Sequence, residues 1–148
     1  MEEDNERSFN CAESVMIRVD RESSLPGFND SLMRVASVLG DGFVGSGEVC
    51  GAASGGVLCL ALMTGTRGTE TVEEFKEKRR FARSVINDFM NEFANDWGSV
   101  ECKFLPAMDS GQIPTKGLLR NKPGKNLCEE YVDWCTEKVL NIRKNLNI

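Results

Sequence analysis

The stretch Gly45-Ser46-Gly47-Glu48-Val49-Cys50-Gly51-Ala52-Ala53-Ser54-Gly55-Gly56, followed by an apolar run over residues 57–63, decides the fold. An apolar run of this kind predicts a buried helix, and serine is a residue type that caps helix N-termini. We therefore predict a helix that is capped by Ser46 and ends near Gly65. Cys50 would lie in its first turn, where the helix dipole lowers the pKa of a thiol.

The residues that follow Cys50 have almost no side-chain volume. Glycine inside a helix costs roughly 1 kcal/mol relative to alanine, so the two adjacent glycines at 55 and 56 indicate that something needs the space. The sequence leaves three occupants open: a second helix packed backbone against backbone, a cofactor, or a second subunit.

The composition is that of an ordinary soluble domain. With 148 residues, 41% apolar and 28% charged, the chain is long enough to bury a core without disulfides or metals. The net charge of −5, and the lack of an arginine-rich stripe with interleaved aromatic residues, argue against a nucleic-acid partner. Residues 1–7 are acidic, unlike a signal peptide, and no apolar run approaches the roughly 20 residues of a membrane span. We expect a cytoplasmic protein whose thiols are reduced.

Histidine is absent. This excludes Ser-His-Asp and Cys-His nucleophilic pairs, zinc sites of the HExxH type and histidine-ligated haem or Rieske centres. Any redox or metal chemistry must therefore use sulfur and carboxylates.

Periodicity predicts one all-α domain over residues 1–148, a bundle of about five helices. We expect helices over 8–22 with Ser8 as the cap, from Asn29 or Asp30 to residue 40, after Cys50, over 71–97, and from residue 126 onward. Residues 1–7 should form a disordered tail. Residues 106–126, which are irregular and basic, should form a lid or partner-contact loop.

The long helix has the clearest signals. Thr71 and Glu74 have the spacing of a capping box. Gly98 is the expected end of the helix. Between these two ends, apolar side chains recur on one stripe, which comprises Phe75, Ala82, Ile86, Phe89, Phe93 and Trp97. Cations gather on the outer surface of this helix, either as a solvated face or as a docking patch: Lys76, Lys78, Arg79 and Arg80.

Six cysteines are present, and two of them look structural. Cys59 and Cys135 are expected in helix interiors as small core residues. Cys128 and Cys135 lie about 10 Å apart along a helix and cannot form a disulfide while it is intact. The other four are Cys11, Cys50, Cys102 and Cys128, and their spacings fit no local zinc or ferredoxin motif.

The surroundings of these cysteines carry a resemblance. The motif Cys50-Gly51-Ala52-Ala53-Ser54-Gly55, with one cysteine before it and two after it, resembles the C-GCAxxG-C-C family of small helical redox-active proteins. The resemblance runs from about residue 8 to 142. It implies that the functional thiols are those of Cys11, Cys50, Cys102 and Cys128, with Cys135 as the alternative for the fourth position. A similar arrangement occurs in split-Soret cytochromes, where an iron–sulfur site has been inferred, but this chain lacks their haem ligands.

We expect these four cysteines to ligate an iron–sulfur cluster, [2Fe–2S] or [4Fe–4S], with Gly51 and Gly55 letting the backbone approach the cofactor. Such a protein would transfer electrons to a partner protein or sense redox state. Two alternatives are a metal-free thiol–disulfide protein with Cys50 as the attacking thiolate, and a helical domain with structural zinc. We also expect a homodimer, formed through the Gly/Ala face near Cys50 or through the helix over 71–97.

Overall fold

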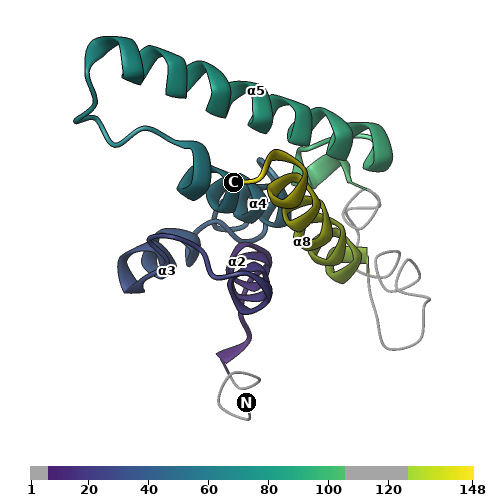
Figure 1. The fold of residues 1–148 in the computed structure, drawn as a ribbon. Helices are drawn as coiled ribbons and strands as arrows, with labels where there is room; N and C mark the ends of the chain where they lie inside the picture. The colour runs from purple at the N-terminus through teal and green to yellow at the C-terminus, as the bar shows by residue number, and fades with distance from the viewer. Residues whose placement is uncertain (1–6, 106–126) are drawn as a thin grey trace.

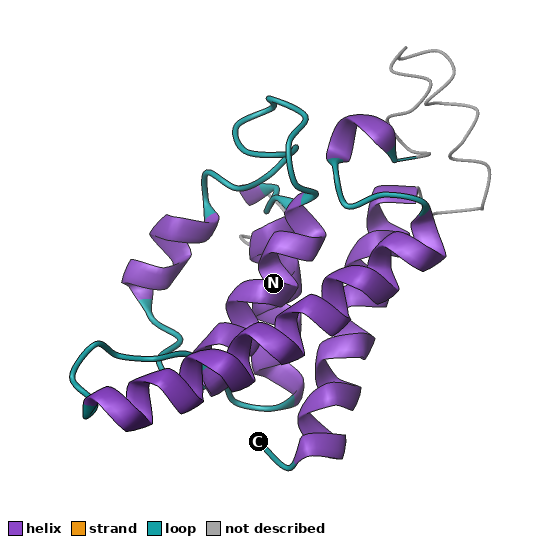
Figure 2. Ribbon diagram, turned by 90° about the horizontal axis from the view of Figure 1, so that it is seen from above, coloured by secondary structure: helices purple, strands orange, loops and turns teal. Residues whose placement is uncertain are grey.

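A computed structural model of the chain describes residues 7–105 and 127–148. The expected tail over 1–7, except its last residue, and the expected basic loop over 106–126 lie outside these described residues. The all-α class is confirmed: the described residues form helices and no sheet (Figure 2). In chain order they are α2 Cys11–Glu22, α3 Asp30–Ala36, α4 Gly51–Thr64, α5 Val72–Trp97, the 3-10 helix η1 Cys102–Phe104, and α8 Leu127–Leu146.

Helix α4 is the centre of the bundle. It packs against α2, α5 and α8, and Figure 1 shows α5 crossing it on one side while α2 and α3 lie on the other. Nine of its fourteen residues are buried. A helix that is apolar on all sides can bury its whole circumference only in such a central position. The predicted helix after Cys50 is therefore confirmed.

The small residues of α4 make room for protein. A Cβ atom at Gly55 would lie 2.7 Å from the backbone oxygen of Ala12 in α2, and one at Gly56 would lie 2.4 Å from the Phe89 ring in α5. Of the three occupants left open by the sequence, a second helix fills the space. The Gly/Ala face is thus covered by other parts of the same chain and cannot form the expected dimer contact. Of the two surfaces predicted as dimer interfaces, only that on α5 is exposed.

Helix α5 begins and ends as predicted. The Thr71 hydroxyl accepts a hydrogen bond from the backbone N–H of Glu74 at 3.3 Å, and Gly98 closes the helix in the left-handed region. Of the predicted stripe, Ala82, Phe89 and Phe93 are buried, whereas Ile86 and Trp97 are half-buried; Val85, outside the stripe, is also buried. The first ten residues, except half-buried Phe75, are exposed because α5 extends past α4 (Figure 1).

Aromatic side chains join α5 to α8. The ring of Phe93 lies edge-on to Tyr131 and Trp134, with centroids 5.9 and 5.4 Å apart. Trp97 lies 4.8 Å from Tyr131, and the indole N–H of Trp134 donates to a carboxylate oxygen of Asp96 at 2.8 Å. Edge-to-face pairs of this kind stabilise a contact by about 0.5–1.5 kcal/mol beyond the area they bury.

The first helix has a different cap from the one expected. Asn10, not Ser8, precedes α2: its side-chain oxygen accepts from the Glu13 N–H, and the Glu13 carboxylate accepts from the Asn10 N–H, both at 2.9 Å. This reciprocal pair satisfies two helix N-terminal donors, which Ser8, two residues farther out, cannot reach. Helix α3 begins after Asn29 as predicted but ends at Ala36, four residues early.

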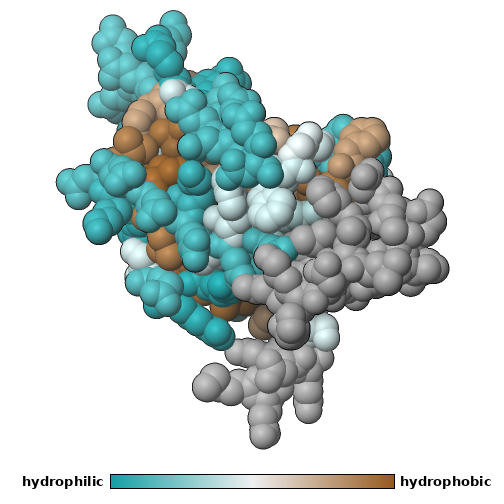
Figure 3. All heavy atoms as spheres, turned by 90° about the vertical axis from the view of Figure 1, so that its right-hand side faces the viewer, coloured by the Kyte–Doolittle hydropathy of each residue, from teal (hydrophilic) through white to brown (hydrophobic). Residues whose placement is uncertain are grey.

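The face in Figure 3 is largely hydrophilic, with hydrophobic side chains between the polar ones. Among the described helices, none is long and apolar enough to cross a membrane.

Candidate functional site

The four cysteines implied by the resemblance each lie at the N-terminal end of a helix. Cys50 is the N-cap of α4, Cys11 is the first residue of α2, Cys102 is the first residue of η1, and Cys128 is the second residue of α8. Helix N-termini present free N–H groups and the positive end of the dipole, which favour thiolates and other anions. Cys59 and Cys135, by contrast, lie inside helices. The sequence could not establish this common placement, because helix boundaries read from periodicity are uncertain by a few residues.

Ser46 does not cap α4. Its hydroxyl lies 2.7 Å from the backbone oxygens of both Gly42 and Phe43, so it closes the preceding loop instead. Cys50 itself takes the cap position, with φ −51° and ψ 132° and without a capping side-chain hydrogen bond. The prediction that Cys50 lies in the first turn of this helix is therefore correct to within one turn. The prediction that Ser46 caps the helix is wrong.

A short antiparallel bridge brings Cys50 and Cys102 to adjoining segments. Val49 pairs with Glu101. The Cys50 N–H donates to the Val100 oxygen at 2.7 Å, and the Cys102 N–H donates to the Glu48 oxygen at 2.6 Å. Residues 50 and 102 are therefore diagonal neighbours on the same face of this pair. Sequence analysis missed the bridge, since a single pair of residues leaves no periodic signal.

Cys11 reaches the same place from the other side of α4. A Cβ atom built on Gly51 would lie 3.2 Å from the Cβ of Cys11, so the first residue of α2 contacts the first residue of α4. On the opposite segment, a Cβ on Gly42 would lie 2.8 Å from that of Cys102, and Gly42 has a positive φ of 69°. Cys11 and Cys102 thus flank the N-terminus of α4 and its cap residue, Cys50.

The thiol of Cys50 is not acidic. Burial raises its pKa from the ordinary 9.0 to about 12, the N–H groups of Ala53 and Ala52 lower it, and the nearby thiols of Cys11 and Cys102 raise it further. Cys50 is only 3% exposed, so the loss of water outweighs the hydrogen bonds at the helix end. The prediction of a lowered pKa is therefore wrong: it considered the helix end and not the packing around it.

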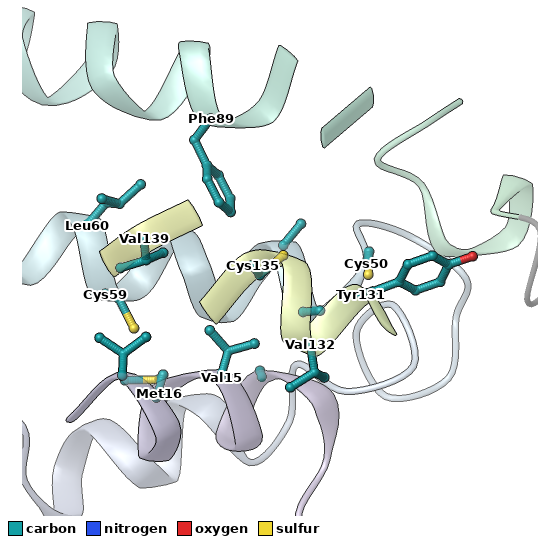
Figure 4. Close-up of a cluster of buried hydrophobic side chains, with 14 of the residues drawn as sticks. Val15, Met16, Cys50, Cys59, Leu60, Phe89, Tyr131, Val132, Cys135 and Val139 are labelled. Carbon is teal, nitrogen blue, oxygen red and sulfur yellow. The ribbon is translucent and has the colours of Figure 1, made fainter. Parts of the chain in front are cut away.

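Cys59 and Cys135 lie in the core, as predicted (Figure 4). Burial, and then the Asp20 carboxylate, raise the pKa of Cys59 to about 12. Burial also raises the pKa of Cys135, with further contributions from Cys50, Cys59 and Cys11. Cys135 is thus close enough to two of the candidate thiols to interact with them, and it stays an alternative to Cys128.

The thiols converge without forming a closed ligand set. None of the six cysteines forms a disulfide bond with another. Within residues 7–105 and 127–148, no three Cys, Asp or Glu side chains are grouped so that they could hold a metal ion. Cys11, Cys50 and Cys102 are brought to one end of α4.

The loop before Cys50 has a strained backbone. Asp41, Phe43 and Val44 all have positive φ, at 52°, 65° and 47°, although β-branched residues such as valine rarely adopt this conformation. Backbone hydrogen bonds hold it, among them Val44 N–H to the Val38 oxygen at 3.0 Å and Glu48 N–H to the Gly42 oxygen at 3.0 Å. The glycines of the loop are thus part of a left-handed turn against Cys102.

Comparison with known proteins agrees with this cysteine arrangement. The family C_GCAxxG_C_C, described as "Putative redox-active protein", matches residues 9–142. No curated protein and no solved structure matches the chain. Since the match covers nearly the whole chain, including all six cysteines, the chain belongs to the C_GCAxxG_C_C family.

Proposed function

We propose that this protein binds an iron–sulfur cluster through Cys11, Cys50, Cys102 and Cys128 and uses it to transfer electrons or to sense redox state. The observation that carries the proposal is the meeting of Cys11, Cys50 and Cys102 at one end of α4, each at the start of a helix. An all-sulfur donor set in a chain without histidine suits iron–sulfur clusters.

The residues fit the cluster in chemistry. Helix N-termini favour the negative charge of a thiolate-ligated cluster. The N–H groups of Ala52 and Ala53 are near enough to the Cys50 thiol to lower its pKa, and hydrogen bonds to ligand sulfurs tune the reduction potential of such a centre. Within residues 7–105 and 127–148 no three Cys, Asp or Glu side chains are grouped to hold a metal ion, so cluster binding would draw these helix ends together.

When bound, the cluster would supply one-electron redox chemistry. The protein residues hold the ligand sulfurs at helix ends and keep water from the buried Cys50. Gly51 places Cys11 beside the cap of α4, and Gly55 holds α2 against α4. Both glycines therefore position ligands, and direct contact between them and the cofactor stays a prediction. Six cysteines with no disulfide among them suit a reducing compartment, and we propose that the protein acts in the cytoplasm with an electron-transfer partner.

The metal-free alternative is less favoured. An attacking thiol works best with a pKa near the ambient pH, whereas that of Cys50 is raised to about 12. Metal ligation removes this obstacle because binding itself displaces the thiol proton. Structural zinc would be bound by the same sulfur atoms, so metal analysis is needed to distinguish zinc from iron.

The test is the visible spectrum, with iron, zinc and acid-labile sulfide analysis, of protein purified without oxygen. Visible absorption with stoichiometric iron and sulfide supports the proposal. Serine at position 11, 50, 102 or 128 should abolish the absorption, whereas Cys59→Ser serves as the control and should keep it. Zinc without iron would favour the structural alternative, and metal-free protein whose thiols disappear in pairs on oxidation would favour thiol–disulfide exchange. A series with Cys135→Ser decides which cysteine takes the fourth position.

A further inference from the structure

The exposed half of α5 carries a cluster of cations. Residues 76–83 contain five cationic residues and one acidic residue, in a chain whose net charge is −5. Four of the cations, Lys76, Arg79, Arg80 and Arg83, are three or four residues apart and therefore share one side of the helix. All four are exposed. We call this set the cationic face of α5.

Within the described parts of the chain, ion pairs do not neutralise the cationic face. Lys78, outside the set, pairs with Glu70 at 4.0 Å, and the Arg79 guanidinium lies 4.3 Å from the centre of the Phe75 ring. Among the ion pairs of residues 7–105 and 127–148, none includes Lys76, Arg80 or Arg83. Like charges three and four residues apart destabilise a helix, so the cluster weakens α5 rather than supporting it.

The position of this face separates it from the cysteines. It lies on the half of α5 that extends past α4, whereas Cys102 follows the other end of α5 (Figure 1). From residue 83 to residue 97 the helix covers about 21 Å at 1.5 Å per residue. A molecule bound to the cationic face would leave the N-terminus of α4 uncovered. The face therefore has a role distinct from the proposed cluster.

We propose that the cationic face of α5 is a docking surface for an acidic patch on another protein. The face extends about 10 Å along the helix. Ser84, Asn87 and Asn91 line the same side and add hydrogen-bonding groups, and the one carboxylate there, that of Asp88, is outnumbered by the four cations. A compact acidic patch matches this length and its charge. A long polyanion such as a nucleic acid would also meet the rest of the chain, whose excess of acidic residues repels it. The proposal does not depend on the cluster.

The test measures binding of the full chain to fluorescently labelled poly-L-glutamate at low salt, with Arg79→Gln/Arg80→Gln/Arg83→Gln as the variant. We expect binding that weakens as salt is added, and a loss of roughly tenfold or more in affinity in the variant. A pair of substitutions in other helices, Arg34→Gln/Lys144→Gln, is the control and should change the affinity less than about twofold. Circular dichroism checks that the variant keeps its helix content, which the removal of like charges should favour.

Several results would overturn the proposal. Absence of binding at low salt, or an equal loss in a control pair, would show that the cationic face is not a specific site for acidic chains. Tighter binding of a DNA duplex, lost in the same variant, would assign the face to nucleic acid. Self-association in gel filtration that the variant abolishes would assign it to a second copy of this chain.

Discussion

Replacing Gly55 by alanine tests the contact on which the bundle is built. The added Cβ would lie 2.7 Å from the backbone oxygen and 3.0 Å from the Cα of Ala12. Both neighbours are backbone atoms of α2, so the clash can be relieved only by moving one helix away from the other. Overpacking of a close contact costs about 1–3 kcal/mol, and alanine returns about 1 kcal/mol through its higher helix propensity.

Because the 2.7 Å contact is with a backbone atom, the clash should lie in the upper part of the overpacking range, about 2–3 kcal/mol. After the propensity gain of about 1 kcal/mol, we expect Gly55→Ala to lower the free energy of unfolding by about 1–2 kcal/mol. The assay is urea denaturation followed by circular dichroism, in which the midpoint should fall while the slope stays constant. Asn87→Ala, on the exposed side of α5, is the control for helix propensity alone and should not be destabilising. A Gly55→Ala protein as stable as the wild type would refute backbone-to-backbone packing of α2 on α4.

Three further predictions concern other parts of the molecule. Phe89→Ala removes a fully buried ring and should cost about 3–5 kcal/mol in urea denaturation; a loss below 1 kcal/mol would mean that the ring is not packed against Gly56. Val44→Asn should stabilise the protein by up to about 1 kcal/mol, because asparagine tolerates the positive φ at this exposed site better than valine does; a lower melting temperature would contradict the strain. In metal-free protein the buried thiols of Cys50 and Cys59, both with pKa raised to about 12, stabilise the fold below pH 9, and this contribution is lost as pH rises from 9 toward 12. Thermal melts should therefore shift downward over that interval, and a constant melting temperature would show that these thiols are not buried.

The parts of the fold that could be predicted are those governed by local rules. The period of Phe89 and Phe93 and the cap at Thr71 define α5 without reference to the rest of the chain. The same reasoning places Cys135 on the inner side of the last helix. These features depend only on neighbours within one or two turns, and the structure agrees with them.

The candidate site depends on contacts that are distant in the sequence. The pairing of Val49 with Glu101 and the contact of Cys11 with Gly51 join residues about 50 and 40 positions apart, and no local pattern encodes either. The lowered pKa predicted for Cys50 is wrong for the same reason, since its burial and the nearby thiols of Cys11 and Cys102 depend on segments distant in the sequence. Membership in the family, by contrast, could be recognised from the motif at Cys50 and the order of the cysteines around it.

The seam between α5 and α8 also gives the protein an intrinsic optical probe. The chain has two tryptophans, Trp97 and Trp134, and both contact aromatic rings across this seam. Their emission will therefore report the separation of these two helices, whereas far-ultraviolet circular dichroism follows all helices together. Coincident transitions by the two methods would mean that the bundle unfolds as one unit, and an earlier fluorescence transition would mean that α8 leaves α5 first.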